Sequence, residues 1–218
     1  MSEVLNLSEE KLMQAIDEAK KKGRKRNFEQ SVEIVITTEG LDLKKPENRV
    51  LQIITLPQKM SREKKLCVFA DGETAEKALN SGADRVISRR ELDSLAGNRK
   101  EVKKISKSFD FFLAEPPFMG NIGKVFGFAL GPKGKMPQVI TPSTDLERRI
   151  EALKNSARIH LRNRPEASCS IGTEKMPSKE LAKNAQAVIS SFDQSIREKG
   201  KTKKIYLKLT MVEPVRVV

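Results

Sequence analysis

Residues 124–137 constrain the fold of this chain more strongly than any other stretch, and they read KVFGFALGPKGKMP. The apolar first half, residues 125–130, is typical of a buried helix. Pro132 ends that helix because proline donates no backbone hydrogen bond. Gly131 and Gly134 permit the backbone angles of a tight turn, with a lysine on each side of Gly134. The stretch therefore predicts a buried helix followed at once by a basic surface turn.

Two phosphate-binding loops can be tested against this turn. A Walker loop needs a second glycine five residues after the first, then Lys and Ser or Thr. Counting from Gly127, that position is Pro132, and neither Ser nor Thr follows Lys135. Residues 131–134 do spell the GXXG of a KH domain, whose loop clamps a nucleic-acid backbone. Pro137 disfavours the helix that should follow such a loop, so KH is the weaker interpretation.

The charge of the chain points to a polyanionic partner. The 218 residues carry a formal net charge of +13, and 33% of them are charged. Such a surplus favours nucleic acid over a membrane surface as the partner, and a basic protein without either is the plainest alternative. No apolar run approaches the roughly 18 residues that span a bilayer. The N-terminus also lacks a signal-peptide layout, so we expect a cytoplasmic protein.

The sequence offers little for catalysis or metal binding. Cys67 and Cys169 each lie in a short apolar run without a CxxC motif, which predicts buried thiols in a reducing cytosol. His160 is the only histidine, which disfavours a histidine-based metal site or catalytic triad. The acidic residues form no convincing catalytic pair. We therefore expect no catalytic residues, no metal and no cofactor.

The N-terminal segment reads as one helix and two strands. Ser8 is expected to cap a helix that Gly23 ends. Residues 28–36 alternate as a strand, with Val32 on the apolar face and Ser31 on the polar one. Residues 49–56 are expected to form a second strand.

The C-terminal segment continues the same α+β character. Residues 158–161 and 167–171 are strand-like, and Ser178 begins a long amphipathic helix. A last strand follows, in which apolar side chains alternate at Ile205, Leu207, Leu209 and Met211.

The middle of the chain is expected to alternate strands and helices. Strands are expected at residues 66–70, 85–88 and 109–114, with helices at 74–80, at 92–106 interrupted or started at Gly97, and at 125–130. This β-α-β-α-β-α order predicts a small, parallel, Rossmann-like three-layer sheet. Six of the nine phenylalanines lie between residues 109 and 128, where we expect domain core. A further helix ending at Leu153 would be capped by Ser143 or Thr144.

These patterns predict two domains. The two ends hold too little apolar sequence for two separate domains, so residues 1–61 and 157–218 are expected to form one discontinuous α+β terminal domain. Residues 62–156 would be an α/β domain inserted into it. Residues 1–61 contain 11 basic and 10 acidic residues, and residues 157–218 contain 13 and 6. Residues 62–156 contain 18 basic and 13 acidic residues.

Three segments together resemble the large-subunit ribosomal protein one family. Residues 130–137, LGPKGKMP, resemble its signature, while FEQSVE at residues 28–33 and Thr210-Met211 resemble its two RNA-facing segments in order and spacing. The short form, without extra terminal extensions, resembles archaeal or bacterial members, and we expect an archaeal one. The residues of the signature turn are Gly131, Pro132, Lys133, Gly134, Met136 and Pro137.

The resemblance implies a structural protein of the large ribosomal subunit that is not an enzyme. It implies binding to large-subunit rRNA in the mobile stalk, assistance in releasing deacylated tRNA from the exit site, and repression of translation through the leader of its own mRNA. It also implies a protein that contacts no membrane and is a monomer when free of the ribosome.

The resemblance places four residues against the RNA, namely Phe28, Ser31, Thr210 and Met211. The chain departs from the family at Val212-Glu213, where Gly-Pro is usual, and at Asn27, where lysine is common. Basic residues flank both segments and suit phosphate contacts. Those expected to contribute are Lys25, Arg26, Lys203, Lys204 and Lys208.

Two other functions stay open at this point. A nucleotide-binding enzyme could use the inserted α/β domain, although the glycine fingerprint and paired carboxylates that it would need are missing. A general single-strand nucleic-acid binder would show no preference for a structured stalk RNA.

Overall fold

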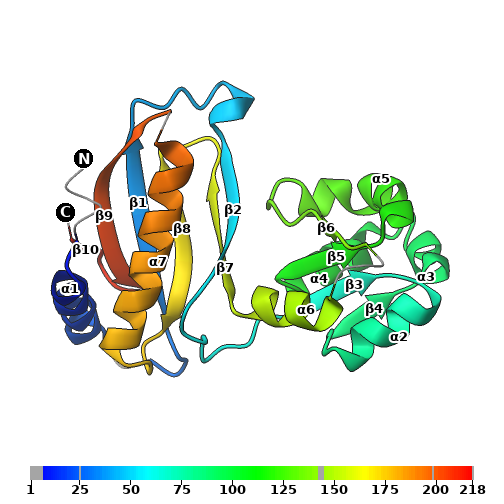
Figure 1. Cartoon of the computed structure of the whole chain (residues 1–218), viewed down its shortest axis with the longest axis horizontal. Coiled ribbons are helices and arrows are strands. Elements are labelled where there is room, and N and C mark those ends of the chain that lie inside the picture. Colours follow the sequence, from blue (N-terminus) through cyan, green and yellow to red (C-terminus); the bar gives the residue numbers. More distant parts are fainter. Residues whose placement is uncertain (1–6, 25, 142–144, 198, 218) are drawn as a thin grey trace. The chain divides into compact units, whose positions relative to one another are not determined.

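The computed structural model describes residues 7–24, 26–141, 145–197 and 199–217 (Figure 1). The chain forms two compact units. The terminal unit comprises Met1–Arg62 and Asn155–Val218, and the inserted unit comprises Glu63–Lys154.

The terminal unit is built on a four-stranded antiparallel sheet that needs both ends of the chain. Its order is β10 (Val215–Arg216), β9 (Lys201–Leu209), β1 (Ser31–Glu39) and β8 (Glu166–Thr173). Strand β1 from the N-terminal segment therefore lies between two strands from the C-terminal segment (Figure 1). This interleaving makes one sheet out of residues more than a hundred positions apart.

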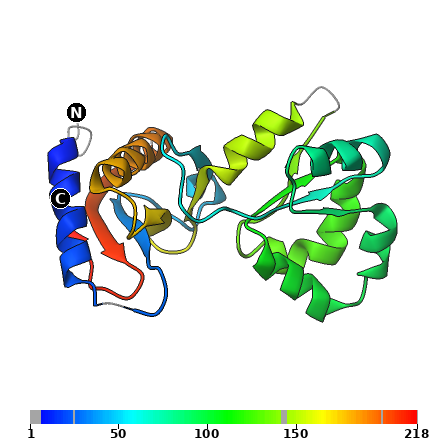
Figure 2. The same ribbon diagram turned by 90° about the horizontal axis from the view of Figure 1, so that it is seen from below.

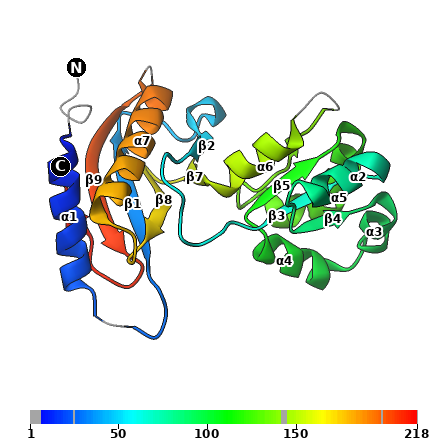
Figure 3. The same ribbon diagram turned by 60° about the horizontal axis from the view of Figure 1, so that its bottom comes forward.

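Two helices, α1 (Glu9–Lys22) and α7 (Ser178–Ile196), pack on one side of this sheet (Figures 2 and 3). Ser8 caps α1 as predicted, because its hydroxyl accepts a hydrogen bond from the N–H of Lys11 at 3.4 Å. The inward-facing side chains of β1 and β9 alternate as predicted and are buried with the apolar stripe of α7. The predicted core of this unit is thus confirmed.

A two-stranded antiparallel sheet, β2 (Val50–Thr55) with β7 (Ser156–Leu161), completes the terminal unit. A short 3-10 helix, η2 (Pro46–Asn48), precedes β2. Val50 and Ile54 of β2 and Ile159 of β7 join the same hydrophobic core as α7.

The inserted unit is a three-layer α/β structure. Its four strands are all parallel, in the order β4 (Arg85–Ile87), β3 (Leu66–Phe69), β5 (Phe111–Ala114) and β6 (Gln138–Val139). Strands β3 and β5 are buried on both faces, as expected for a sheet between two helical layers. One layer is formed by α3 (Arg89–Ser94), α4 (Arg99–Ser108) and α5 (Met119–Leu130), with η3 (Pro116–Phe118) before α5, and the other by α2 (Gly72–Asn80) and α6 (Leu146–Lys154).

The predicted fold class, α+β terminal segments around an α/β insert, is confirmed. The break expected at Gly97 within the helical stretch 92–106 is also confirmed: the stretch is two helices, α3 and α4, and the φ of Gly97 is 91°, in the left-handed region. Other local predictions need correction. Strands β6 and β10 were missed, because two residues are too few to show a period. The caps expected at Ser143 and Thr144 lie outside the described residues.

Two apolar side chains are also placed differently from the prediction. Phe128 is 42% exposed, although the phenylalanines of this region were all expected in the core. It lies about 200° around α5 from the buried Phe126, because each helical residue turns by about 100°. Met211 does not continue the inward alternation of the last strand, since β9 ends at Leu209 and the chain turns.

Candidate nucleic-acid interface

The two segments predicted to face RNA meet at one corner of the four-stranded sheet. Val32 pairs with Leu209, so Ser31 and Thr210 continue the β1–β9 ladder at its end. The N–H of Thr210 donates to the carbonyl of Ser31 at 3.1 Å. The Thr210 hydroxyl accepts from the N–H of Ser31 at 3.2 Å and lies 3.4 Å from its carbonyl oxygen. The Thr210 hydroxyl therefore links the first residue of β1 to the segment after β9 through hydrogen bonds within the protein.

A buried glutamine, Gln30, connects the same two segments through further hydrogen bonds. The carbonyl oxygen of the Gln30 side chain accepts from the N–H of Met211 at 3.3 Å. Glu174, just after β8, accepts from the backbone N–H of Gln30 at 3.1 Å and from its side-chain amide at 3.3 Å. Gln30 and Glu174 were not among the predicted site residues. Their link spans 144 residues of sequence, so no local motif could have revealed it.

Two apolar side chains remain exposed beside this network. Phe28 is 50% exposed just before β1, and Met211 is 62% exposed just after β9. An exposed ring and an exposed thioether both suit contact with the faces of unpaired bases. We define the recognition patch as Phe28, Ser31, Thr210 and Met211.

A groove of about 390 Å³ opens next to Met211. Arg26, predicted from the sequence, lines it, and Lys25 lies outside the described residues. The concentration of cations in one concave place favours an anionic ligand there. The other lining residues are Lys22, Arg24, Val212 and Glu213, so two of the three residues that depart from the family pattern form part of this groove.

The outer face of β9, away from α1 and α7, carries further predicted cations. Lys204 and Lys208 lie on this face with Tyr206 between them, and all three are half-buried. Lys208 lies 3.8 Å from Glu33 of β1, and Lys203 lies 3.1 Å from Glu39. Both ion pairs are partly exposed, so solvent screens them and the lysines can exchange a carboxylate for a phosphate at small cost. Tyr206 adds an aromatic ring that the sequence-based site had not included.

The signature turn lies in the inserted unit, whereas the recognition patch lies in the terminal unit. Gly134 has a φ of 62°, which explains the glycine. The ammonium of Lys135 donates to the carbonyls of Phe109 and Ser106 at 2.6 and 3.3 Å, and that of Lys133 donates to the Ser106 hydroxyl at 3.0 Å. These lysines therefore fasten the turn to the C-terminal end of α4. A strand and not a helix follows the turn, so the KH interpretation is wrong.

The described residues offer little for catalysis. They contain no group of three or more His, Cys, Asp or Glu side chains that could hold a metal ion. Burial raises the pKa of the Cys67 thiol to about 12, so it is a poor nucleophile. A groove of about 350 Å³ in the inserted unit is lined by three carboxylates and one lysine among its charged groups, which disfavours a phosphate ligand. No helix in the described part of the chain has both the length and the apolarity required to cross a bilayer.

The fold and the site together define a class of protein: a basic α+β unit made from both ends of the chain, interrupted by a three-layer α/β unit. The profile of the Ribosomal protein L1p/L10e family matches residues 19–212. The chain belongs to this family.

Curated relatives agree with this assignment over almost the full chain. The large ribosomal subunit protein uL1 of Thermococcus kodakarensis is 42% identical over 210 residues, covering 95% of this chain and 97% of that protein. The proteins of the same name from Archaeoglobus fulgidus and Pyrobaculum calidifontis are each 39% identical, covering 97% and 95% of this chain and 99% and 93% of those proteins. These organisms are archaea, as expected from the sequence, and the relatives are named as ribosomal proteins and not as enzymes.

Proposed function

We propose that this protein is a structural constituent of the large ribosomal subunit that binds large-subunit rRNA through its terminal unit. Membership of the ribosomal family and the names of the relatives support the first part. On this proposal the protein acts in the cytoplasm, is a monomer when free, and holds the stalk rRNA. Residues 1–61 and 157–218 would form the RNA-binding domain, and residues 62–156 an inserted domain with its own core.

One observation carries the RNA-binding part of the proposal. Ser31 and Thr210 are 179 positions apart in the sequence and are joined by three short contacts, with exposed Phe28 and Met211 beside them. Such a rigid corner with apolar side chains pointing outward suits recognition of a folded RNA, whose unpaired bases can pack against it.

The surrounding cations would hold the RNA backbone. Arg26 in the groove and Lys208 on the outer face of β9 lie near the recognition patch, while Lys204 and Lys203 lie further along the same strand. Lys25 is proposed for the same role from its place in the sequence. These contacts fix the orientation of the RNA without reading its bases, because phosphates are alike in every sequence.

The proposal includes two further roles. The recognition patch would also bind the leader of the protein's own mRNA where that leader folds like the stalk rRNA, and so repress translation. On the ribosome, the stalk carrying this protein would assist the release of deacylated tRNA from the exit site.

A binding experiment with three RNAs tests the proposal. Affinity should be measured for a stalk rRNA fragment, for the mRNA leader and for an unrelated hairpin, at several salt concentrations. We expect a clear preference for the first two RNAs and a loss of affinity with salt, at a slope of about −0.7 to −0.9 per phosphate contact. Equal affinity for all three RNAs would favour a general nucleic-acid binder. Tight binding of a mononucleotide, without RNA binding, would favour a nucleotide-dependent enzyme.

A further inference from the structure

The positive charge of the inserted unit resides on one helix. Residues 63–154 contain 17 Lys and Arg against 13 Asp and Glu, and α4 alone contains five against one. The remainder of the unit is therefore balanced, with 12 basic and 12 acidic residues. The excess is not spread as a solubilising charge over the unit but is confined to a short segment.

The lysines of α4 share the exposed side of the helix. Val102, Ile105 and Ser106 form its buried side. From the first to the last the exposed lysines span seven positions, with Lys103 and Lys104 side by side, so they follow one stripe about 10 Å long at 1.5 Å per residue. That length is enough to meet several successive phosphates of a nucleic-acid strand. The stripe consists of Lys100, Lys103, Lys104 and Lys107.

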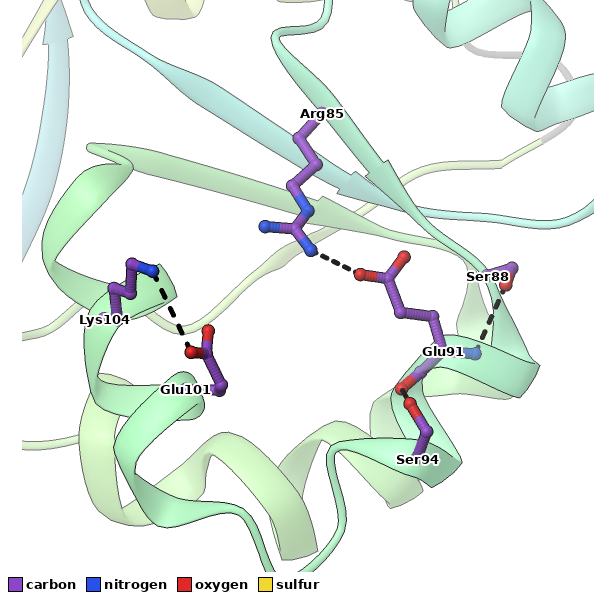
Figure 4. Close-up of polar contacts among 6 residues, drawn as sticks. All are labelled: Arg85, Ser88, Glu91, Ser94, Glu101 and Lys104. Atoms are coloured by element: carbon purple, nitrogen blue, oxygen red, sulfur yellow. Dashed lines mark hydrogen bonds and ion pairs between the residues drawn. The ribbon is translucent and has the colours of Figure 1, made fainter.

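Most of these lysines lack a carboxylate partner. Within the described residues, only Lys104 is in an ion pair, with Glu101 at 3.9 Å (Figure 4). Some cations elsewhere in the unit are paired: Arg85 is hydrogen-bonded to Glu91, and the N–H of Glu91 donates to the hydroxyl of the Ser88 cap (Figure 4). Unneutralised cations in one row raise the local positive potential and attract a polyanion.

An aromatic side chain lies at the N-terminal end of the stripe. The guanidinium of Arg99 lies over the ring of Phe128, 5.5 Å from its centre, and Phe128 is still 42% exposed. Lys124 lies one helical turn before Phe128 on α5 and is also exposed. An unpaired base can stack on a guanidinium that lies over an exposed ring. An acidic protein or a lipid headgroup has no base to stack there, so this feature favours a nucleic acid as the ligand.

We propose that the α4 surface, formed by this lysine stripe with Arg99 and Phe128, is a second RNA-binding surface that does not read sequence. It is separate from the recognition patch, which belongs to the other unit. Lys133 and Lys135 of the signature turn hold the C-terminal end of α4 through hydrogen bonds and so fix the direction of the lysine stripe. RNA would bind with its phosphates along the lysines and an unpaired base at Phe128.

The test compares two double variants of the full chain. Lys100→Gln/Lys103→Gln removes two unpaired charges from the stripe, and glutamine preserves helix propensity. Lys77→Gln/Arg148→Gln is the matched control, because it removes two charges from α2 and α6, where each is already paired with an acidic residue. Affinity is measured across salt concentrations for an unrelated RNA hairpin with an unpaired loop, and for polyglutamate as an acidic polypeptide.

We expect the stripe variant to bind the hairpin several-fold more weakly, with a salt slope shallower by about 1.4 to 1.8. The control should bind as the unaltered chain does. Phe128→Leu should weaken binding to the looped hairpin by at least about fivefold and leave a fully paired duplex unaffected. The proposal is overturned if the stripe variant and the control bind the hairpin equally, or if the stripe variant loses binding only to polyglutamate. Preference for the stalk RNA should survive in both variants, so this test is independent of the proposed function.

Discussion

The side chain of Gln30 is almost fully buried, with 1% exposed, and Glu174 accepts two hydrogen bonds from this one residue. Gln30 in turn accepts from the N–H of Met211. A carboxylate just after β8 thus fixes a glutamine just before β1, and that glutamine holds the turn after β9. The recognition patch is therefore positioned by residues that need not touch RNA themselves.

Replacing this carboxylate should loosen the patch. Glu174→Ala would leave the buried amide of Gln30 without its acceptor, which costs about 1 to 3 kcal/mol in the free energy of unfolding. We expect weaker binding to stalk RNA, even though a negative charge has been removed. Urea unfolding and RNA titration measure both effects.

Glu166→Ala is the matched control for this prediction. It removes the same charge at the opposite end of β8, but its partner Arg164 is largely exposed, so stability should change little. RNA affinity should stay equal or rise slightly in the control. Equal RNA affinities for the two variants would contradict a positioning role of Glu174.

The Thr210 hydroxyl offers a second, finer test. Thr210→Val keeps the shape of the side chain but removes its hydrogen bonds to Ser31, which should cost about 0.5 to 1.5 kcal/mol of stability. Thr210→Ser keeps the hydroxyl and should stay near the unaltered protein. We expect only the valine variant to lose affinity for stalk RNA relative to an unrelated hairpin. If the valine variant loses affinity equally for both RNAs, or for neither, the patch is placed wrongly.

His160 should make the stability of the terminal unit depend on pH. Burial, with the nearby Arg162 and Arg158, lowers the pKa of His160 below its ordinary value of 6.5. The unfolded chain then binds more protons than the folded one as pH falls through 6.5, so the free energy of unfolding decreases. Above that range histidine is neutral in both states and contributes no dependence.

Urea unfolding at pH 7.5, 6.5 and 5.5 measures this effect. Since His160 is the only histidine, His160→Gln should remove the decrease between pH 7.5 and 5.5 that the unaltered chain shows. Identical pH profiles for the two proteins would mean that the environment of His160 is not as described.

The two buried cysteines report separately on the two units. Cys67 lies on β3 of the inserted unit, and Cys169 lies on β8 of the terminal unit. In single-thiol variants, Cys67→Ala and Cys169→Ala, thiol labelling in rising urea should give two transitions at different concentrations if each unit is a domain. A shortened chain without residues 63–154 should still protect Cys169. A single shared transition, together with loss of that protection, would contradict independent domains.

The sequence predicted elements best where many residues repeat one pattern. The alternation of Val32, Ile34 and Ile36 and the apolar stripe of α7 come from burial on one side, which is visible in the residues themselves. The resemblance to a known family supplied the recognition patch, which periodicity alone could not. The patch itself remains a prediction until RNA binding is measured.

What sequence reasoning missed depends on contacts between distant positions. The hydrogen bonds between Gln30 and Glu174 exist only because β1 and β8 pair. The hydrogen bonds from Lys135 to carbonyls at the C-terminal end of α4 exist only because α4 and α5 pack together. Phe128 was predicted wrongly because residues 125–130 are apolar on all sides of α5, so the sequence does not show which side of the helix faces solvent. In each case the deciding information is tertiary.

A hydroxyl-radical footprint on large-subunit rRNA tests the central claim most directly. The unaltered chain should protect one compact region in the stalk, and Phe28→Ala/Met211→Ala should lose that protection while remaining folded, since both side chains are largely exposed. The control Leu79→Ala/Val139→Ala alters two equally exposed apolar side chains of the inserted unit and should keep the protection. Protection that persists in the Phe28 and Met211 variant, or that never localises to the stalk in the unaltered chain, would contradict the account.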